Sequence, residues 1–121
     1  MVKAVFPGTF DPIHFGHIDI AVRAARLFDE VIVAVYDRPL KTLLFSPEER
    51  ISLVQKTFAP HSNISVMGYN TLTVQFCRQI GAQVIVRGLR VFSDYEQEFK
   101  LGLANHRLAP EIESVMLITK S

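Results

Sequence analysis

The residues best suited to chemistry lie in one stretch, Phe6–His17, with the sequence Phe-Pro-Gly-Thr-Phe-Asp-Pro-Ile-His-Phe-Gly-His. An apolar run passes there through a turn rich in glycine and proline into an amphipathic segment. Such a turn binds phosphate, because free backbone N–H groups and the positive end of the helix dipole face the anion. His14 and His17 add side-chain donors. No further His/Cys cluster lies at ligand spacing for zinc, so the stretch predicts a phosphate site.

A second cluster, Arg87-Gly88-Leu89-Arg90, directly follows the short apolar run 83–86. Arginine offers planar, forked N–H donors that match the geometry of phosphate. Taken alone, the cluster fits a surface turn with two solvated charges equally well. Beside the first stretch, we interpret the two arginines as a pair that holds phosphate.

Two further residues become candidate binding residues only because of where we expect them to lie. Lys41 lies in a proline-containing loop after the apolar run 30–36, opposite the phosphate turn. A loop lysine taken alone would be a solvated charge. Glu98 lies one turn into the helix that we expect from Ser93 onward, and it could accept a hydrogen bond from a ribose or a base.

The segments that position these residues alternate between short apolar runs and longer amphipathic stretches. We expect strands over 2–6, 30–36, 63–67, 83–86 and 114–119, and helices over 15–28, 46–58, 71–80 and 93–108. Capping boxes at Ser46/Glu49 and Ser93/Glu96, and Gly81 as a C-cap, mark helix ends. The alternation predicts an α/β fold, a five-stranded parallel sheet with helices on both faces. Ligands bind such sheets beyond the carboxyl ends of the strands, where the candidate residues collect.

Length and charge narrow the possible classes of protein. The 121 residues suffice for one domain, 1–121, with one core. A net charge of +1 gives no bulk electrostatic case for a nucleic-acid or membrane partner. The single cysteine excludes an intrachain disulfide and fits a reducing compartment, and no apolar run is long enough to span a bilayer. We therefore expect a cytoplasmic protein.

Together the two clusters resemble a known family. Pro7-Gly8-Thr9-Phe10-Asp11-Pro12 with His14-x-Gly16-His17 resembles the nucleotidylyltransferase superfamily. Val86-Arg87-Gly88-Leu89-Arg90, followed by Asp94-Tyr95-Glu96-x-Glu98, is similar to the bacterial phosphopantetheine adenylyltransferases. That family transfers the adenylyl group of ATP to 4′-phosphopantetheine, giving dephospho-coenzyme A and pyrophosphate. The resemblance covers essentially the whole chain and implies the Rossmann-like fold of that superfamily.

The resemblance also implies roles for single residues. His17, Lys41 and Arg90 would be the catalytic donors. ATP would be held by Thr9, Phe10, His17, Gly88, Leu89, Arg90 and Glu98, and phosphopantetheine by Thr9, Lys41, Thr73 and Arg87. Position 73 usually carries a larger apolar residue, so threonine there departs from the family pattern. Mg²⁺ would arrive bound to ATP, and no residue is expected to form a separate metal site.

Three further expectations follow from the resemblance. The family forms homo-oligomers, typically hexamers, and coenzyme A feedback is a possible regulation. The sequence stops at Thr119-Lys120-Ser121, before the serine-rich turn and helix that follow the fifth strand in the family. Two alternatives remain open: another small nucleotidylyltransferase, such as one acting on nicotinamide mononucleotide, and a catalytically silent, truncated nucleotide-binding relative.

Overall fold

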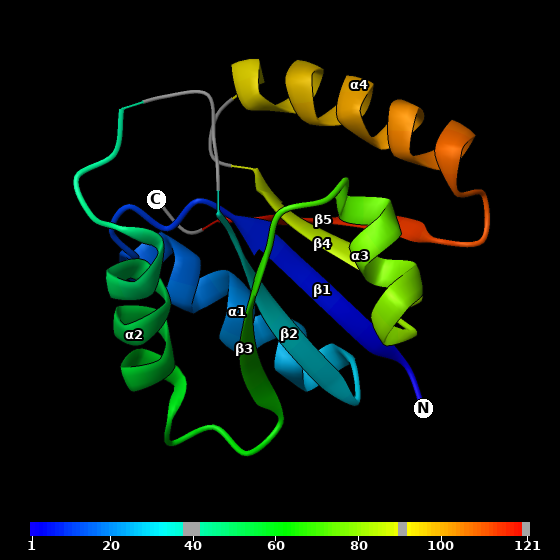
Figure 1. The fold of residues 1–121 in the computed structure, drawn as a ribbon. Helices are drawn as coiled ribbons and strands as arrows, with labels where there is room; N and C mark the ends of the chain where they lie inside the picture. The colour runs from blue at the N-terminus through cyan, green and yellow to red at the C-terminus, as the bar shows by residue number, and fades with distance from the viewer. Residues whose placement is uncertain (38–41, 90–91, 120–121) are drawn as a thin grey trace.

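Five strands and four helices alternate along the chain and form one parallel sheet covered by helices on both faces (Figure 1). The computed structural model describes residues 1–37, 42–89 and 92–119. The elements are β1 (Lys3–Gly8), α1 (Phe15–Leu27), β2 (Glu30–Tyr36), α2 (Pro47–Phe58), β3 (Ile64–Tyr69), α3 (Thr73–Ile80), β4 (Val84–Leu89), α4 (Phe92–Leu108) and β5 (Glu113–Ile118). The predicted fold class is confirmed.

The strand order is β3-β2-β1-β4-β5, so β1 is the central strand. From β1 the chain runs outward through β2 to β3, then crosses back to β4 on the other side of β1. The crevice between the carboxyl ends of β1 and β4 is therefore the switch point, where open α/β sheets bind ligands.

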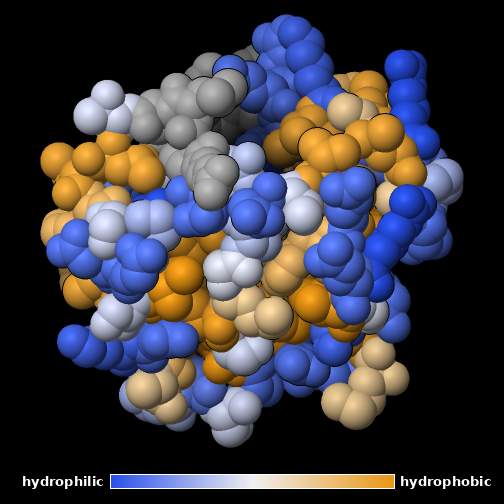
Figure 2. All heavy atoms as spheres, in the orientation of Figure 1, coloured by the Kyte–Doolittle hydropathy of each residue, from blue (hydrophilic) through white to orange (hydrophobic). Residues whose placement is uncertain are grey.

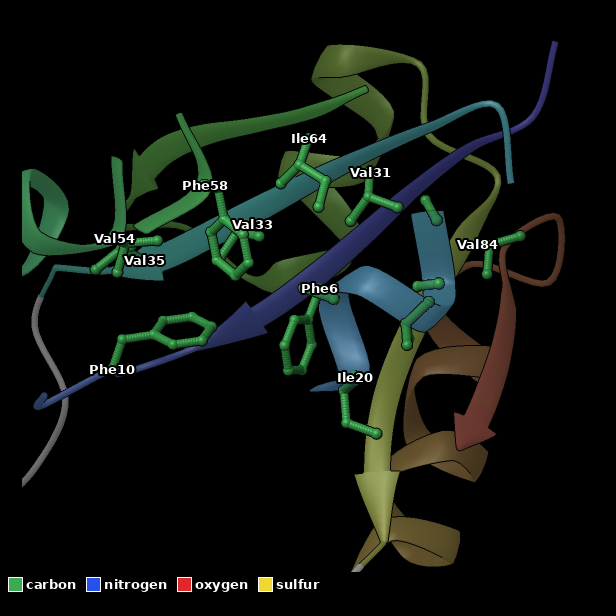
Figure 3. Close-up of a cluster of buried hydrophobic side chains, with 14 residues drawn as sticks. Phe6, Phe10, Ile20, Val31, Val33, Val35, Val54, Phe58, Ile64 and Val84 are labelled. Atoms are coloured by element: carbon green, nitrogen blue, oxygen red, sulfur yellow. The ribbon is translucent and has the colours of Figure 1, made fainter. Parts of the chain in front are cut away.

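Side chains of the sheet alternate between two cores. On one face, Phe6, Val33 and Val35 pack against α1 and α2 in the larger cluster (Figure 3). On the other face, Val5 and Ile32 pack against α3 and the segment that follows α4. Strands buried on both faces account for the nearly continuous apolar runs of the sequence.

Two of the helix ends follow the predicted local chemistry. At the start of α2, Ser46 Oγ accepts from the Glu49 N–H and the Glu49 carboxylate accepts from the Ser46 N–H, completing the capping box. At the end of α3, Gly81 takes the left-handed conformation with φ 73°. Glycine adopts that conformation without the steric cost that a Cβ would add.

Two predicted boundaries are wrong in ways that affect the site. β4 continues to Leu89 rather than ending at 86, because β5 pairs with it as far as Leu89 and Ile118. Arg87 and Gly88 therefore belong to the strand instead of following it. α4 begins at Phe92, one residue before the predicted start at Ser93. The other elements keep their places, with ends shifted by one or two residues.

The surface mixes polar and apolar residues, with an apolar area over α4 (Figure 2). The large exposed apolar side chains of that helix are Phe99, Leu101, Leu103 and Leu108. Among the described residues, no helix is long and apolar enough to cross a membrane.

Candidate active site

A pocket of about 240 Å³ opens at the switch point. β1 and β4 form its floor, α1 and α4 its walls, and the residue after β5 its rim. Its lining residues are Phe6, Pro7, Gly8, His14, Gly16, His17, Ile20, Arg87, Gly88, Glu98 and Thr119. The structure thus brings parts of the first cluster, around Gly8 and His17, together with Arg87 and Gly88 of the second at one edge of the sheet.

Two histidines build the start of α1. His14 is the N-cap residue, and its Nδ1 accepts from the Gly16 N–H at 3.1 Å. His17 Nδ1 accepts in return from the His14 N–H at 3.1 Å. The two rings stack with centroids 3.8 Å apart, and the His17 ring also meets the edge of Phe10 at 4.7 Å. This reciprocal arrangement fixes the direction of both rings.

These hydrogen bonds also fix where each imidazole holds its proton. An Nδ1 atom that accepts from a backbone N–H carries no proton itself, so the proton lies on Nε2. Both histidines thus carry their proton on Nε2 at a helix N-terminus, where the positive end of the helix dipole also favours an anion. The pair can therefore donate hydrogen bonds to phosphate oxygens.

The turn after β1 is built around Phe10. This residue has φ 52°, and its ring is only 2% exposed, packed edge-on against Phe6. A Cβ at Gly8 would lie 3.0 Å from the Phe10 ring, so glycine is needed for the ring to fold back this closely. Because Phe10 is buried in the core and does not line the pocket, its contact with ATP stays a prediction.

Arg87 and Glu98 form an ion pair across the pocket wall. Arg87 Nε donates to Glu98 Oε2 at 2.8 Å and Arg87 Nη2 to Oε1 at 2.9 Å. The side chains are 29% and 15% exposed. A guanidinium has five N–H donors. Glu98 uses two of those on Arg87 and sets the plane of the group, so the other three point away from the carboxylate.

Not every predicted site residue reaches this pocket. Lys41 and Arg90 lie outside the described residues. Leu89 is held at the sheet, where its carbonyl accepts from the Thr119 N–H at 2.8 Å. The Thr73 hydroxyl lies 3.0 Å from that of Tyr69, so this threonine bonds within the protein at the start of α3. Four of the described candidates do not line the pocket, namely Thr9, Phe10, Thr73 and Leu89.

Sequence reasoning missed Arg50, a fully buried arginine of α2. Its guanidinium contacts the carbonyl of Thr9, directly beside the Phe10 turn. An arginine on an amphipathic helix resembles a solvated charge, and no motif of the sequence distinguishes it. Within the described part of the chain, no group of three or more His, Cys, Asp or Glu residues could hold a metal ion.

The comparisons agree with this geometry. A family model described as Cytidylyltransferase-like matches residues 5–121, so the fold and the site define a domain of the nucleotidylyltransferase class. Phosphopantetheine adenylyltransferase of Chloroflexus aggregans is 53% identical over 95% of this chain and 71% of its own length. The phosphopantetheine adenylyltransferase of Roseiflexus sp. is 51% identical over 98% of this chain and 74% of its own length. The chain belongs to the phosphopantetheine adenylyltransferase family.

Solved structures support the fold alone. A lipopolysaccharide core biosynthesis protein from Thermoplasma volcanium superposes with a TM-score of 0.74 at 21% identity, covering 100% of this chain and 99% of that one. A bifunctional NMN adenylyltransferase/ADP ribose pyrophosphatase from Francisella tularensis superposes with a TM-score of 0.71 at 15% identity, covering 99% of this chain and 38% of that one. The arrangement of strands and helices is therefore shared well beyond the family.

Proposed function

We propose that this chain transfers the adenylyl group of ATP to 4′-phosphopantetheine, giving dephospho-coenzyme A and pyrophosphate in coenzyme A biosynthesis. The observation that supports it most is the pocket at the switch point, where His17 and Arg87 bring cationic or N–H donors to one place. Family membership at 53% identity supplies the substrate class.

The chemistry needs placement more than covalent assistance. A phosphate oxygen of phosphopantetheine attacks the α-phosphorus of ATP, a new P–O bond forms, and the bond to the departing pyrophosphate breaks. The nucleophile is the substrate's own oxygen, so no side chain needs to form a covalent intermediate. Negative charge on the phosphoryl oxygens is stabilised by preorganised donors. The His17 Nε2–H, at the positive end of the α1 dipole, is such a donor.

The two substrates divide the pocket. Arg87, oriented by Glu98, is suited to bind the phosphate of phosphopantetheine with its remaining donors. Gly88 lines the pocket, where its main chain can approach ATP closely. Thr9 and Phe10 are proposed to bind ATP as the resemblance implies. Lys41 and Arg90 are proposed to add positive charge near the α-phosphate and pyrophosphate, as the resemblance implies.

Mg²⁺ is proposed to enter as a complex with ATP. The donor set of the pocket fits this route, since Glu98, the one carboxylate among its described lining residues, is paired with Arg87. When bound, the ion supplies charge neutralisation on the phosphate oxygens. No protein ligand is required for that role.

The deciding experiment measures pyrophosphate release with ATP, Mg²⁺ and 4′-phosphopantetheine, beside nicotinamide mononucleotide. We expect release with phosphopantetheine alone. His17→Ala should lower kcat by about 10²–10³-fold, the usual cost of losing one such donor. His61→Ala is the matched control, because His61 packs against Phe58 away from the pocket. Equal rates for His17→Ala and the unmodified chain would refute the assigned role, and release only with nicotinamide mononucleotide would refute the substrate.

We also propose that the chain works in the cytoplasm as a homo-oligomer, a hexamer by family resemblance. The apolar side chains exposed on α4, such as Phe99 and Leu103, support burial against another copy. Light scattering on the purified chain tests this proposal, and a monomer at all concentrations would refute it. Coenzyme A feedback is tested by adding coenzyme A to the same rate assay.

A further inference from the structure

Arg50 joins three segments of the chain at the carboxyl edge of the sheet. Its Nη1 donates to the carbonyls of Thr9 at 3.0 Å and Tyr36 at 2.7 Å. Its Nη2 donates to the carbonyl of Asp37 at 3.1 Å, and its Nε to that of Phe45 at 3.3 Å. The side chain is 0% exposed. One buried guanidinium thus holds the turn after β1, the end of β2 and the residues that precede α2.

Asp11, which lies in the turn after β1, also links that turn to the residues that precede α2, here as a hydrogen-bond acceptor. Its Oδ2 accepts from the Leu44 N–H at 2.7 Å and its Oδ1 from the Phe45 N–H at 2.9 Å. In the turn after β1, the Thr9 carbonyl therefore accepts a hydrogen bond from Arg50 of α2. The Asp11 carboxylate of the same turn accepts two hydrogen bonds from backbone N–H groups just before α2. Phe45 takes part in both contacts, since its carbonyl accepts from Arg50.

We propose that Arg50 and Asp11 are positioning residues for adenylyl transfer, fixing the turn 9–11 so that the Phe10 ring holds His17 in place toward the reacting phosphate. This inference rests on the proposed function. The turn needs such support, because Phe10 adopts φ 52°, a conformation that non-glycine residues adopt only when their surroundings hold them there. The Phe10 ring in turn packs against the ring of His17.

The geometry of the contacts requires arginine. All four acceptors are main-chain carbonyl oxygens that belong to three separate segments, and a planar fork reaches them from one side chain. A lysine would keep the charge but would present its donors from a single nitrogen. It could not span the same set of carbonyls. The conservative change Arg50→Lys is therefore the most informative variant.

The experiment compares Arg50→Lys with Val54→Ala, both in the full chain. Val54 lies one turn further along α2, is also 0% exposed and packs in the core, but its side chain has no group that could hydrogen-bond to the turn. Both variants should lower the melting temperature. We expect Arg50→Lys to lower kcat by about 100-fold, a typical effect of misplacing reacting groups by an ångström, with smaller changes in KM for ATP and phosphopantetheine. Val54→Ala should keep the kcat of the unmodified chain.

A second pair of variants keeps the test decisive if Arg50→Lys fails to fold. Asp11→Asn retains one acceptor oxygen and places an amide NH₂ against a backbone N–H, so we expect kcat to fall by about tenfold. Asp29→Asn is its control, since Asp29 also accepts from a backbone N–H, that of Val2, but does so beyond the amino end of β2. Equal kcat values for Asp11→Asn, Asp29→Asn and the unmodified chain would overturn the proposal. A kcat loss in Val54→Ala as large as that in Arg50→Lys would do the same.

Amide signals separate this inference from the proposed function. In ¹H–¹⁵N spectra, Arg50→Lys or Asp11→Asn should shift the amides of Thr9, Phe10 and His14, whereas Val54→Ala should leave them in place. If the unmodified chain releases no pyrophosphate with any substrate, the proposed function fails. The same spectra then still decide whether Arg50 fixes the turn, and unshifted Thr9 and Phe10 amides would refute that it does.

Discussion

Replacing Glu98 by glutamine tests whether this residue acts on Arg87 or directly on the nucleotide. The carboxylate now accepts two N–H groups of Arg87, at 2.8 and 2.9 Å. Glutamine has nearly the same shape but no charge. Its NH₂ group would face one of the two Arg87 donors, so the two-point contact becomes a single neutral one.

The expected size of the effect follows from the burial of the pair. Exposed ion pairs contribute about 0–1 kcal/mol, whereas removing one partner of a buried pair costs about 3–5 kcal/mol. The side chains of Arg87 and Glu98 are 29% and 15% exposed, which places this pair between those limits, at about 1–2 kcal/mol. If that energy orients Arg87 toward phosphopantetheine, KM for this substrate should rise about tenfold.

Steady-state pyrophosphate release and calorimetric titration with phosphopantetheine both measure this effect. Glu111→Gln is the matched control, because Glu111 also pairs with an arginine, Arg78, at 2.7 Å, but that pair is 51% and 56% exposed and lies outside the pocket. We expect Glu111→Gln to leave both KM values unchanged. An increase in KM for ATP alone in Glu98→Gln would refute the reasoning and assign Glu98 to the nucleotide.

The remaining predictions concern stability and reactivity. Ser46→Ala removes the Oγ acceptor of the α2 capping box and should cost about 1 kcal/mol, visible as a fall of the melting temperature in calorimetry. The hydrogen bond from the Ser46 N–H lowers the pKa of the Glu49 carboxyl. Its stabilisation is therefore present above the ordinary pKa and is lost as pH falls through the lowered one, so the stability gap to Glu49→Gln should narrow in acid melts. Burial raises the pKa of the Cys77 thiol to about 11. A disulfide reagent at pH 8 should therefore modify Cys77 only after unfolding.

The fold was predictable because its signals are local. The capping box at Ser46 and the left-handed Gly81 each depend on a few neighbouring residues, and the structure confirms both. The order of apolar runs and amphipathic stretches then leaves few topologies open. The closeness of His17 and Arg87 at one edge of the sheet follows from the parallel arrangement, since parallel strands bring their carboxyl ends together.

The rest depended on contacts between distant parts of the chain. The extension of β4 to Leu89 arises from pairing with β5, which no pattern near Leu89 encodes. The burial of Arg50 depends on carbonyls from three other segments, so its own helix gives no sign of it. The pairing of Glu98 with Arg87 likewise joins α4 to β4 and was not foreseen, whereas its predicted contact with a ribose or a base stays a prediction. Where Lys41 and Arg90 lie stays a prediction.

The central place of β1 has a consequence for synthesis of the protein. β1 pairs early with β2, which follows it closely in the chain, but its other neighbour, β4, begins only at Val84. One side of the first strand therefore stays unpaired while most of the domain leaves the ribosome, and its backbone groups remain open to wrong partners. The two halves of the pocket, around His17 and Arg87, come together only when β4 pairs with β1, and Glu98 and Thr119 follow later still. A nascent chain of this protein thus completes its binding site late in synthesis.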